Sequence, residues 1–234
     1  MKIREKLIQV CGGPYGQVGN AFAVRHDEGW ILIDCGNPAA HGVITENLRY
    51  WGVDPAEITH VLLTHAHFDH AGTAREFREQ GAKIVVGADD APMLRCGGPG
   101  PDSPFVENIM PCCEPDVLIH GDEELCIGGV RVRALAMPGH TAGSLVYLTE
   151  VDGEQLLFSG DMFVCDGEHG DRAKPWWRGD MAYSAQQLSD SFARLWKMKL
   201  QPDIVAGGHG FARIGSGAKD MIGEAYRRFL EDHR

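Results

Sequence analysis

The chain has 234 residues, of which 44% are hydrophobic and 24% are charged, as is typical of a globular protein with a buried core. Its formal net charge of −11 disfavours nucleic acid as a partner, because phosphate binding needs clustered Lys and Arg. The sequence contains no signal peptide and no stretch of about 20 apolar residues for a membrane helix, so we expect no membrane association.

Short apolar runs that end in Gly, Pro or Asp recur along the chain, and their length and β-branching predict strands. In chain order these runs are 31–33, 61–63, 84–86, 130–136, 156–158 and 204–206. Helices are predicted at 39–51, 184–200 and 221–230, and Ser184 and Gln187 have the spacing of a capping box. Strands interleaved with helices indicate an α/β sandwich.

Two long stretches rich in Pro and Gly, 88–115 and 165–179, are predicted to be irregular. Loops of this length inside a domain are usually functional or disordered. We expect these two to form the rim of a substrate pocket, because small-ligand sites combine apolar walls with a few polar groups.

A cluster of four potential metal ligands falls between the second and third predicted strands: His65, His67, Asp69 and His70. On an extended segment His65 and His67 point the same way, and the following turn can carry Asp69 and His70 to a second metal position. Imidazole nitrogens mixed with a carboxylate suit zinc, and also iron or manganese.

Three further candidate ligands, His140, Asp161 and His209, each follow a predicted strand closely, as His65 does. Strand ends at one edge of a sheet can bring such residues together, and a carboxylate such as Asp161 can bridge two cations. We therefore expect two divalent metal ions, zinc before iron or manganese. Two cations lower the pKa of a shared water, so that a metal-bound hydroxide can attack a carbonyl near neutral pH. Asp69 is a candidate for assisting proton movement.

These motifs resemble the metallo-β-lactamase-fold hydrolases, the group that includes glyoxalase II. The resemblance runs from Asn20-Ala21-Phe22 and Ile33-Asp34-Cys35-Gly36 to Gly207-Gly208-His209-Gly210. It implies an αββα four-layer sandwich with the metals at one edge. It further implies one metal on His65, His67 and His140, another on Asp69, His70 and His209, and Asp161 bridging them. Asp34 matches an Asp of the family, and we expect it to accept a hydrogen bond that orients the ligand histidines.

Differences between this chain and individual members of the family narrow the range of possible substrates. Metallo-β-lactamases usually lack a bridging Asp at the position of Asp161, which argues against β-lactam hydrolysis. Because only a short segment follows His209, we expect no C-terminal glutathione-binding region of the kind that glyoxalase II carries. The residues after Asp161 also lack the Cys-Gly-Arg pattern of glyoxalase II and persulfide dioxygenases. The acidic chain disfavours ribonuclease Z, and His67 excludes flavodiiron proteins. Lactonases that open acyl-homoserine lactones share the ligand set, but nothing singles them out.

The leading hypothesis is a binuclear metal-dependent hydrolase acting on an ester, thioester or lactone bond of a small molecule. The alternative is a mononuclear-iron sulfur dioxygenase of the same fold, and the third hypothesis is a catalytically silent metal-binding domain. The expected substrate contacts are Trp176, Trp177 and Arg178, with Lys174 as a second candidate for an anionic group. Further candidates for contact with the substrate are Met93, Phe105, Met110 and His169.

We expect a single domain over residues 1–234, since neither a linker nor a repeat interrupts the chain. The seven cysteines are an odd number and include no C-x-x-C pair, so a reduced, cytoplasmic setting is the simplest interpretation. Most of these cysteines are expected to be buried. Thr64 and Thr141 either orient ligands or end strands. A homodimer is the default expectation from base rates.

Overall fold

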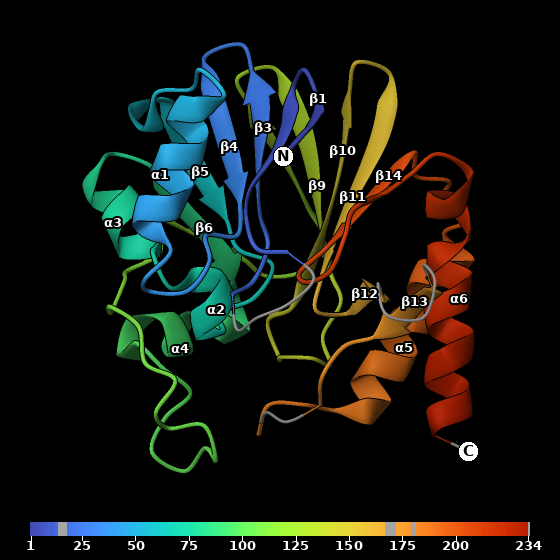
Figure 1. The fold of residues 1–234 in the computed structure, drawn as a ribbon. Coiled ribbons are helices and arrows are strands. Elements are labelled where there is room, and N and C mark those ends of the chain that lie inside the picture. Colours follow the sequence, from blue (N-terminus) through green and yellow to red (C-terminus); the bar gives the residue numbers. More distant parts are fainter. Residues whose placement is uncertain (14–17, 167–171, 179–180, 234) are drawn as a thin grey trace.

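Two β-sheets lie face to face at the centre of the protein, and helices cover their outer faces (Figure 1). The computed structural model describes residues 1–13, 18–166, 172–178 and 181–233. The order of layers is helix, sheet, sheet, helix, which confirms the predicted four-layer αββα sandwich.

The first sheet has seven strands in chain order. They are β1 (Lys2–Arg4), β2 (Leu7–Cys11), β3 (Ala21–His26), β4 (Gly29–Ile33), β5 (Ile58–Leu62), β6 (Lys83–Gly87) and β7 (Val117–Ile119). From β4 to β7 neighbouring strands are parallel, so their carboxyl ends reach the same edge of the sheet.

The second sheet has six strands in the order β15-β14-β11-β10-β9-β8. They are β8 (Glu123–Ile127), β9 (Val130–Ala136), β10 (Leu145–Val151), β11 (Glu154–Gly160), β14 (Ile204–Gly207) and β15 (Arg213–Ile214). β11 and β14 are parallel, so their carboxyl ends also share one edge. A separate two-stranded antiparallel sheet pairs β12 (Phe163–Asp166) with β13 (Arg172–Pro175).

Helices close the two outer faces (Figure 1). On the side of the first sheet lie α1 (His41–Tyr50), α3 (Ala74–Glu79) and α4 (Ala91–Cys96), and on the side of the second lie α5 (Ala185–Lys197) and α6 (Ser216–Asp232). The remaining helical segments of the described residues are the short α2 (Phe68–Ala71) and the 3-10 turns η1 (Pro55–Glu57) and η2 (Ala88–Asp90). As predicted, Ser184 caps α5 by accepting a hydrogen bond from the Gln187 amide. Within the described part of the chain, no helix is long and apolar enough to cross a membrane.

Alternation along the strands explains why the protein has four layers. On β5, Val61 packs under the helices of the first sheet, whereas Leu62 packs between the two sheets. On β14, Val205 packs against the helices of the second sheet, while Ile204 and Ala206 face the first sheet. Successive strand residues point to opposite faces, so a strand with a continuous apolar run needs cover on both sides.

The prediction of irregular structure in 88–115 and 165–179 is partly wrong. The first stretch contains η2 and α4, whose proline lies in the first turn, where it is tolerated, and whose cap Gly97 adopts a left-handed φ of 74°. The second stretch contains the end of β12 and all of β13. No disulfide joins any of the seven cysteines, all of which lie in the described residues; those that are buried are Cys11, Cys35, Cys113 and Cys165.

Two glycines near α1 give a test of local backbone preference. A Cβ at Gly42, the second residue of α1, meets no described atom within 4 Å, and the same holds for Gly52, whose φ is +79°. We expect Gly42→Ala to raise the free energy of unfolding by about 0.5 kcal/mol through helix propensity. Gly52→Ala should lower it by about 1 kcal/mol, because an L side chain is strained at that φ. Urea denaturation of both variants checks this; equal shifts of one sign would contradict it.

Candidate metal centre

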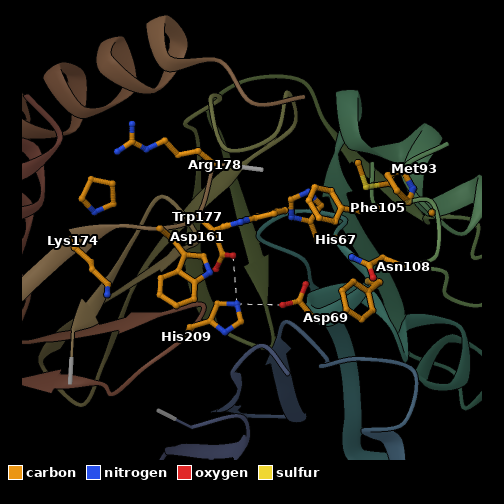
Figure 2. Close-up of a pocket in the computed structure, with 15 residues that line it drawn as sticks. His67, Asp69, Met93, Phe105, Asn108, Asp161, Lys174, Trp177, Arg178 and His209 are labelled. Carbon is orange, nitrogen blue, oxygen red and sulfur yellow. Dashed lines mark ion pairs between the residues drawn. The ribbon is translucent and has the colours of Figure 1, made fainter. Parts of the chain in front are cut away.

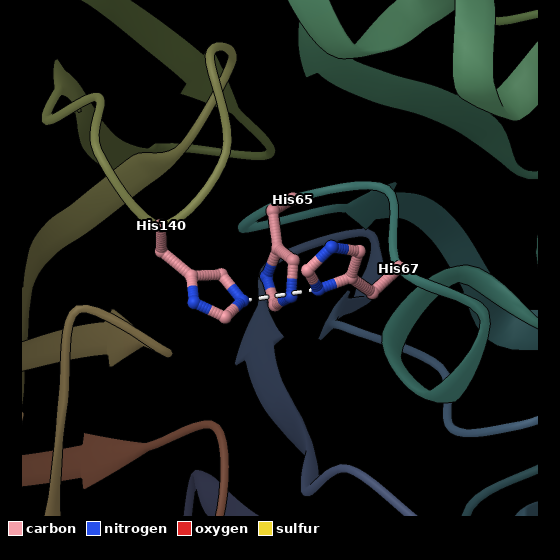
Figure 3. A group of neighbouring side chains, drawn as sticks. All are labelled: His65, His67 and His140. Carbon is pink, nitrogen blue, oxygen red and sulfur yellow. Dashed lines mark hydrogen bonds between the residues drawn. The ribbon is translucent and has the colours of Figure 1, made fainter. Parts of the chain in front are cut away.

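Seven side chains from strand ends and loops meet at one edge of the sandwich, and Figures 2 and 3 show all of them except His70. His65 follows β5, Asp161 directly follows β11 and His209 follows β14, while His140 lies between β9 and β10. The remaining three lie at the start of α2 and within it: His67, Asp69 and His70. The parallel strand pairs explain this convergence, since their carboxyl ends are at the same edge.

Asp161 lies between the histidines. Its Oδ1 is 3.4 Å from His70 Nε2, and its Oδ2 is 3.5 Å from both His140 Nε2 and His209 Nε2. The same Oδ2 is 3.9 Å from His65 Nε2. One carboxylate therefore reaches imidazoles on both sides of the cluster, the position that a bridging ligand requires.

The remaining candidates form two compact sets. Within each set the potential ligand atoms all lie within 4.8 Å of one another: His65, His67 and His140 in one, and Asp69, His70 and His209 in the other. Figure 3 shows the three rings of the first set facing one another. These sets coincide with the two that the family resemblance implied. A third set, His65, His70 and Asp161, connects them.

Hydrogen bonds to Asp34 decide which nitrogen of His65 carries the proton. Asp34 Oδ1 accepts from the Thr64 amide and Oδ2 from the Thr64 hydroxyl, both at 2.7 Å. Because that hydroxyl has only one proton, its 3.1 Å contact with His65 Nδ1 must be donated by the imidazole. His65 Nε2 then carries a free electron pair directed at the cluster. Thr64 therefore orients a candidate ligand.

Two more candidate ligands are oriented through their Nδ1 atoms. His70 Nδ1 lies 3.0 Å from Asp34 Oδ2, and His140 Nδ1 donates to the Trp177 carbonyl at 3.2 Å. In both rings Nε2 is left to face the cluster, as outer partners of metal-binding histidines commonly arrange. Asp34 adopts a φ of 55°, uncommon for a residue with a side chain, and lies where its predicted role requires.

Burial and charge divide the histidines into two classes. Burial lowers the pKa of His65 well below its usual value, and burial also lowers the pKa of His140 to about 4. Burial alone would lower the pKa of His209, but the charge of Asp161 outweighs it and raises that pKa to about 9. The pKa of His70 is raised well above its usual value, because the charges of Asp161 and Asp69 outweigh burial. The same carboxylates would attract a divalent cation in place of these protons.

The donor set fits divalent cations. His65 Nε2 and Asp161 Oδ1 are buried and have no hydrogen-bond partner among the described residues, which is costly unless another group binds them. Ring nitrogens also face one another, with His67 Nδ1 3.0 Å from His140 Nε2 and His70 Nε2 3.2 Å from His209 Nε2. Nitrogen and carboxylate donors directed at shared points are what zinc, iron and manganese bind.

A cavity of about 870 Å³ opens over this centre (Figure 2). Its lining residues include the predicted Trp176, Trp177 and Arg178, together with Lys174, Met93 and Phe105. Trp176 stacks on His209, with ring centroids 4.7 Å apart, and Trp177 meets Phe105 edge to face at the same distance. The prediction for Met110 is wrong: it is 7% exposed and packs in the core of the first sheet. His169 lies outside the described residues.

Two polar residues near the centre were missed by the sequence reasoning. Asn20 Nδ2 donates to the carbonyls of Gly207 and Gly210, at 2.9 and 3.2 Å, and so holds the loop that carries His209. Asp90 is buried and accepts hydrogen bonds from two segments that carry candidate ligands. Both contacts join residues distant in sequence, and although the family resemblance begins at Asn20, it gave this residue no role.

Comparison with known proteins agrees with this geometry. Metallo-beta-lactamase domain-containing protein 1 of Xenopus laevis is 28% identical over 202 residues, covering 85% of this chain and 74% of that protein. Hydroxyacylglutathione hydrolase of Albidiferax ferrireducens is 29% identical over 149 residues, but these are only 49% of its length and 63% of this chain. The matching residues therefore make up about half of this second relative.

Solved structures and family membership point the same way. A metallo-beta-lactamase from Cronobacter sakazakii, a HARLDQ motif mutant, superposes with a TM-score of 0.78 at 22% identity, covering 100% of this chain and 95% of that one. This likeness establishes the fold. The sequence model of the Metallo-beta-lactamase superfamily matches residues 14–209, a range that contains all seven candidate ligands. The chain therefore belongs to the metallo-β-lactamase superfamily of metal-dependent hydrolases.

Proposed function

We propose that the protein is a binuclear hydrolase that cleaves an ester, thioester or lactone bond of a small molecule. The single observation that supports this most strongly is the position of Asp161, whose carboxylate lies within 3.5 Å of His70, His140 and His209. In this proposal His65, His67 and His140 would hold one cation, Asp69, His70 and His209 would hold another, and Asp161 would be shared between them. Two such cations, zinc by preference, supply a water of lowered pKa and a positive charge beside the carbonyl oxygen.

The protein's own groups then hold the site in shape and handle protons. Asp34 and the Trp177 carbonyl keep the Nε2 atoms of His70 and His140 directed inward. Asp69 faces the cavity, with Oδ2 3.2 Å from His209 Nε2, and is placed to take a proton during the attack. Burial raises the pKa of Asp69, but the nearby His70 and His209 lower it overall.

The cavity suggests a substrate with an apolar body and an anionic group. In Figure 2, Lys174 and Arg178 lie on one side of the centre, and Phe105 and Met93 on the other. We propose that Trp176 and Trp177 contact the apolar body and that Arg178 or Lys174 binds the anion. Among the three bond types we favour the thioester, because one relative is named for hydrolysing hydroxyacylglutathione, an acyl thioester.

Arg178→Ala should raise KM for an anionic substrate by about fivefold and leave kcat nearly unchanged, since exposed ion pairs contribute up to about 1 kcal/mol. A neutral isostere of the substrate should be unaffected. Steady-state kinetics on both substrates provides the measurement, with Arg75→Ala as the matched control, because Arg75 is exposed and pairs with Glu79 on α3. Equal changes for both substrates would argue against an anion contact.

Metal analysis combined with a substrate panel tests the proposal as a whole. We expect two metal ions per chain and turnover of thioesters, esters or lactones in preference to phosphodiesters and β-lactams. Turnover should disappear with chelation and return with added zinc. Full activity of the metal-free protein would refute the proposal, and one iron per chain with oxygen uptake on a persulfide would establish the sulfur dioxygenase instead.

A further inference from the structure

Asp90 is a buried carboxylate, 2% exposed, that lies behind the metal centre. It occupies the N-cap position of α4, yet its side chain makes no capping hydrogen bond to that helix. Its Oδ2 accepts from the Ala66 amide at 2.9 Å and from the Thr141 hydroxyl at 2.8 Å, and its Oδ1 accepts from the Gly143 amide at 2.8 Å. Because all three hydrogen bonds come from other segments, this buried carboxylate stabilises the packing of those segments and not the helix.

The segments that Asp90 joins carry every member of one ligand set. Ala66 lies between His65 and His67, and Thr141 follows His140. The first segment extends from the first sheet and the second from the loop between β9 and β10 of the other sheet. One carboxylate therefore sets the separation of two ligand-bearing segments that belong to different sheets.

The hydrogen bonds around Thr141 have one possible direction. The Thr141 amide donates to Ser144 Oγ at 3.0 Å, and the two hydroxyl oxygens are 2.7 Å apart. Because the Thr141 hydroxyl gives its proton to Asp90, the Ser144 hydroxyl must donate to Thr141. The chain of donors runs from Ser144 through Thr141 and ends on the carboxylate, which can only accept. An asparagine at position 90 would keep only one acceptor oxygen. It would therefore lose either the hydrogen bond from the Gly143 amide or the two from Ala66 and Thr141.

Close backbone packing brings the same segments together. A Cβ at Gly87 would overlap the Gly143 carbonyl oxygen, and a Cβ at Gly143 would lie 2.7 Å from Asp90 Cγ. The turn that carries Asp90 and the loop after His140 are therefore in direct backbone contact. The carboxylate adds directional hydrogen bonds to a contact that is already close.

We propose that Asp90 is a positioning residue that sets the geometry of His65, His67 and His140. This inference rests on the proposed metal centre. Asp34 provides a parallel, since it is also buried, at 3% exposed, and accepts from Thr64 and His70. Asp34 reaches both ligand sets, because Thr64 also contacts His65, whereas Asp90 contacts only the segments that carry the first set.

Stepwise zinc binding to the full chain, measured by competition with a chromophoric chelator, tests the role of Asp90. Asp90→Asn should weaken one of two binding steps by about 10- to 100-fold, the usual cost of losing an outer partner of a metal ligand, and leave the other step unchanged. Cobalt substituted in the wild type and in the variant should show an altered visible spectrum for one metal only. Thr141→Val should change the same step in the same direction, while Thr141→Ser, which keeps the hydroxyl, should bind as wild type does.

The outcomes separate this inference from the proposed function. A wild-type chain that binds no zinc would refute the metal centre itself. A wild type with two binding steps, both unchanged in Asp90→Asn and in Thr141→Val, would overturn the role of Asp90 alone. Equal weakening of both steps in Thr141→Val, with a matching loss of metal-free stability in thermal unfolding, would indicate a general structural role and would also overturn it.

Discussion

Replacing Asp161 with asparagine is expected to lower kcat/KM by more than about 100-fold, because even outer partners of metal ligands are worth 10- to 100-fold. The amide keeps the shape of the side chain but loses the charge. It also directs N–H donors at Nε2 atoms 3.4 to 3.5 Å away, on His70 or on His140 and His209. The variant should therefore bind fewer than two metal ions and turn over substrate slowly at saturating zinc.

Asp190→Asn is the matched control for this substitution. Asp190 is on the exposed face of α5, where it accepts from Gln186, and it is not among the residues that line the cavity over the metal centre. Its kcat/KM and its metal content should equal those of the wild type. If Asp161→Asn kept two tightly bound metals and more than a tenth of the activity, Asp161 would not be a bridging ligand.

The sequence predicted best the parts of the fold whose signal is local. The run at 204–206 matches β14 closely, the run at 61–63 overlaps the end of β5, which begins at Ile58, and the Ser184 cap marks the start of α5. The edge strand β8 is different, because most of its residues are half-exposed or exposed, so it lacks the apolar run that identifies a buried strand. In α4 the many prolines and glycines nearby hid a helix that ends on Gly97.

The candidate ligands were predictable for a related reason. Ligands at the ends of apolar runs can converge only if those strand ends lie at the same edge of the sandwich. The parallel strand pairs in both sheets place them there. The groups that orient the ligands were mostly not predictable. Asp90 is 24 residues from Ala66 and 51 from Thr141, and its hydrogen bonds depend on how the two sheets pack. The prediction for Met110 was wrong because an apolar residue in a loop can either line the pocket or pack in the core, and only tertiary packing decides which.

Alanine at Gly208 is expected to disable the metal centre at a moderate cost in stability. A Cβ there would overlap Asp161 Oδ1 and lie 2.8 Å from His70 Cε1. The backbone has little room to yield, because the Gly208 amide donates to Gly160 and its carbonyl accepts from Asn20. The φ of Gly208 is not in the left-handed region, so the clash with ligands is the main cost. We expect kcat/KM to fall by at least about 100-fold, with a loss of about 1–3 kcal/mol in metal-free stability.

Gly121→Ala is the control, since a Cβ at Gly121 meets no described atom within 4 Å and its φ is also outside the left-handed region. Zinc binding and turnover of both variants, compared with urea denaturation of the metal-free chains, separate damage to the site from damage to the fold. Because the methyl group would occupy the space of an Asp161 oxygen, metal can be retained only if that carboxylate moves. A Gly208→Ala chain with two zinc ions and wild-type turnover would mean that the ligands take up another arrangement when they bind metal.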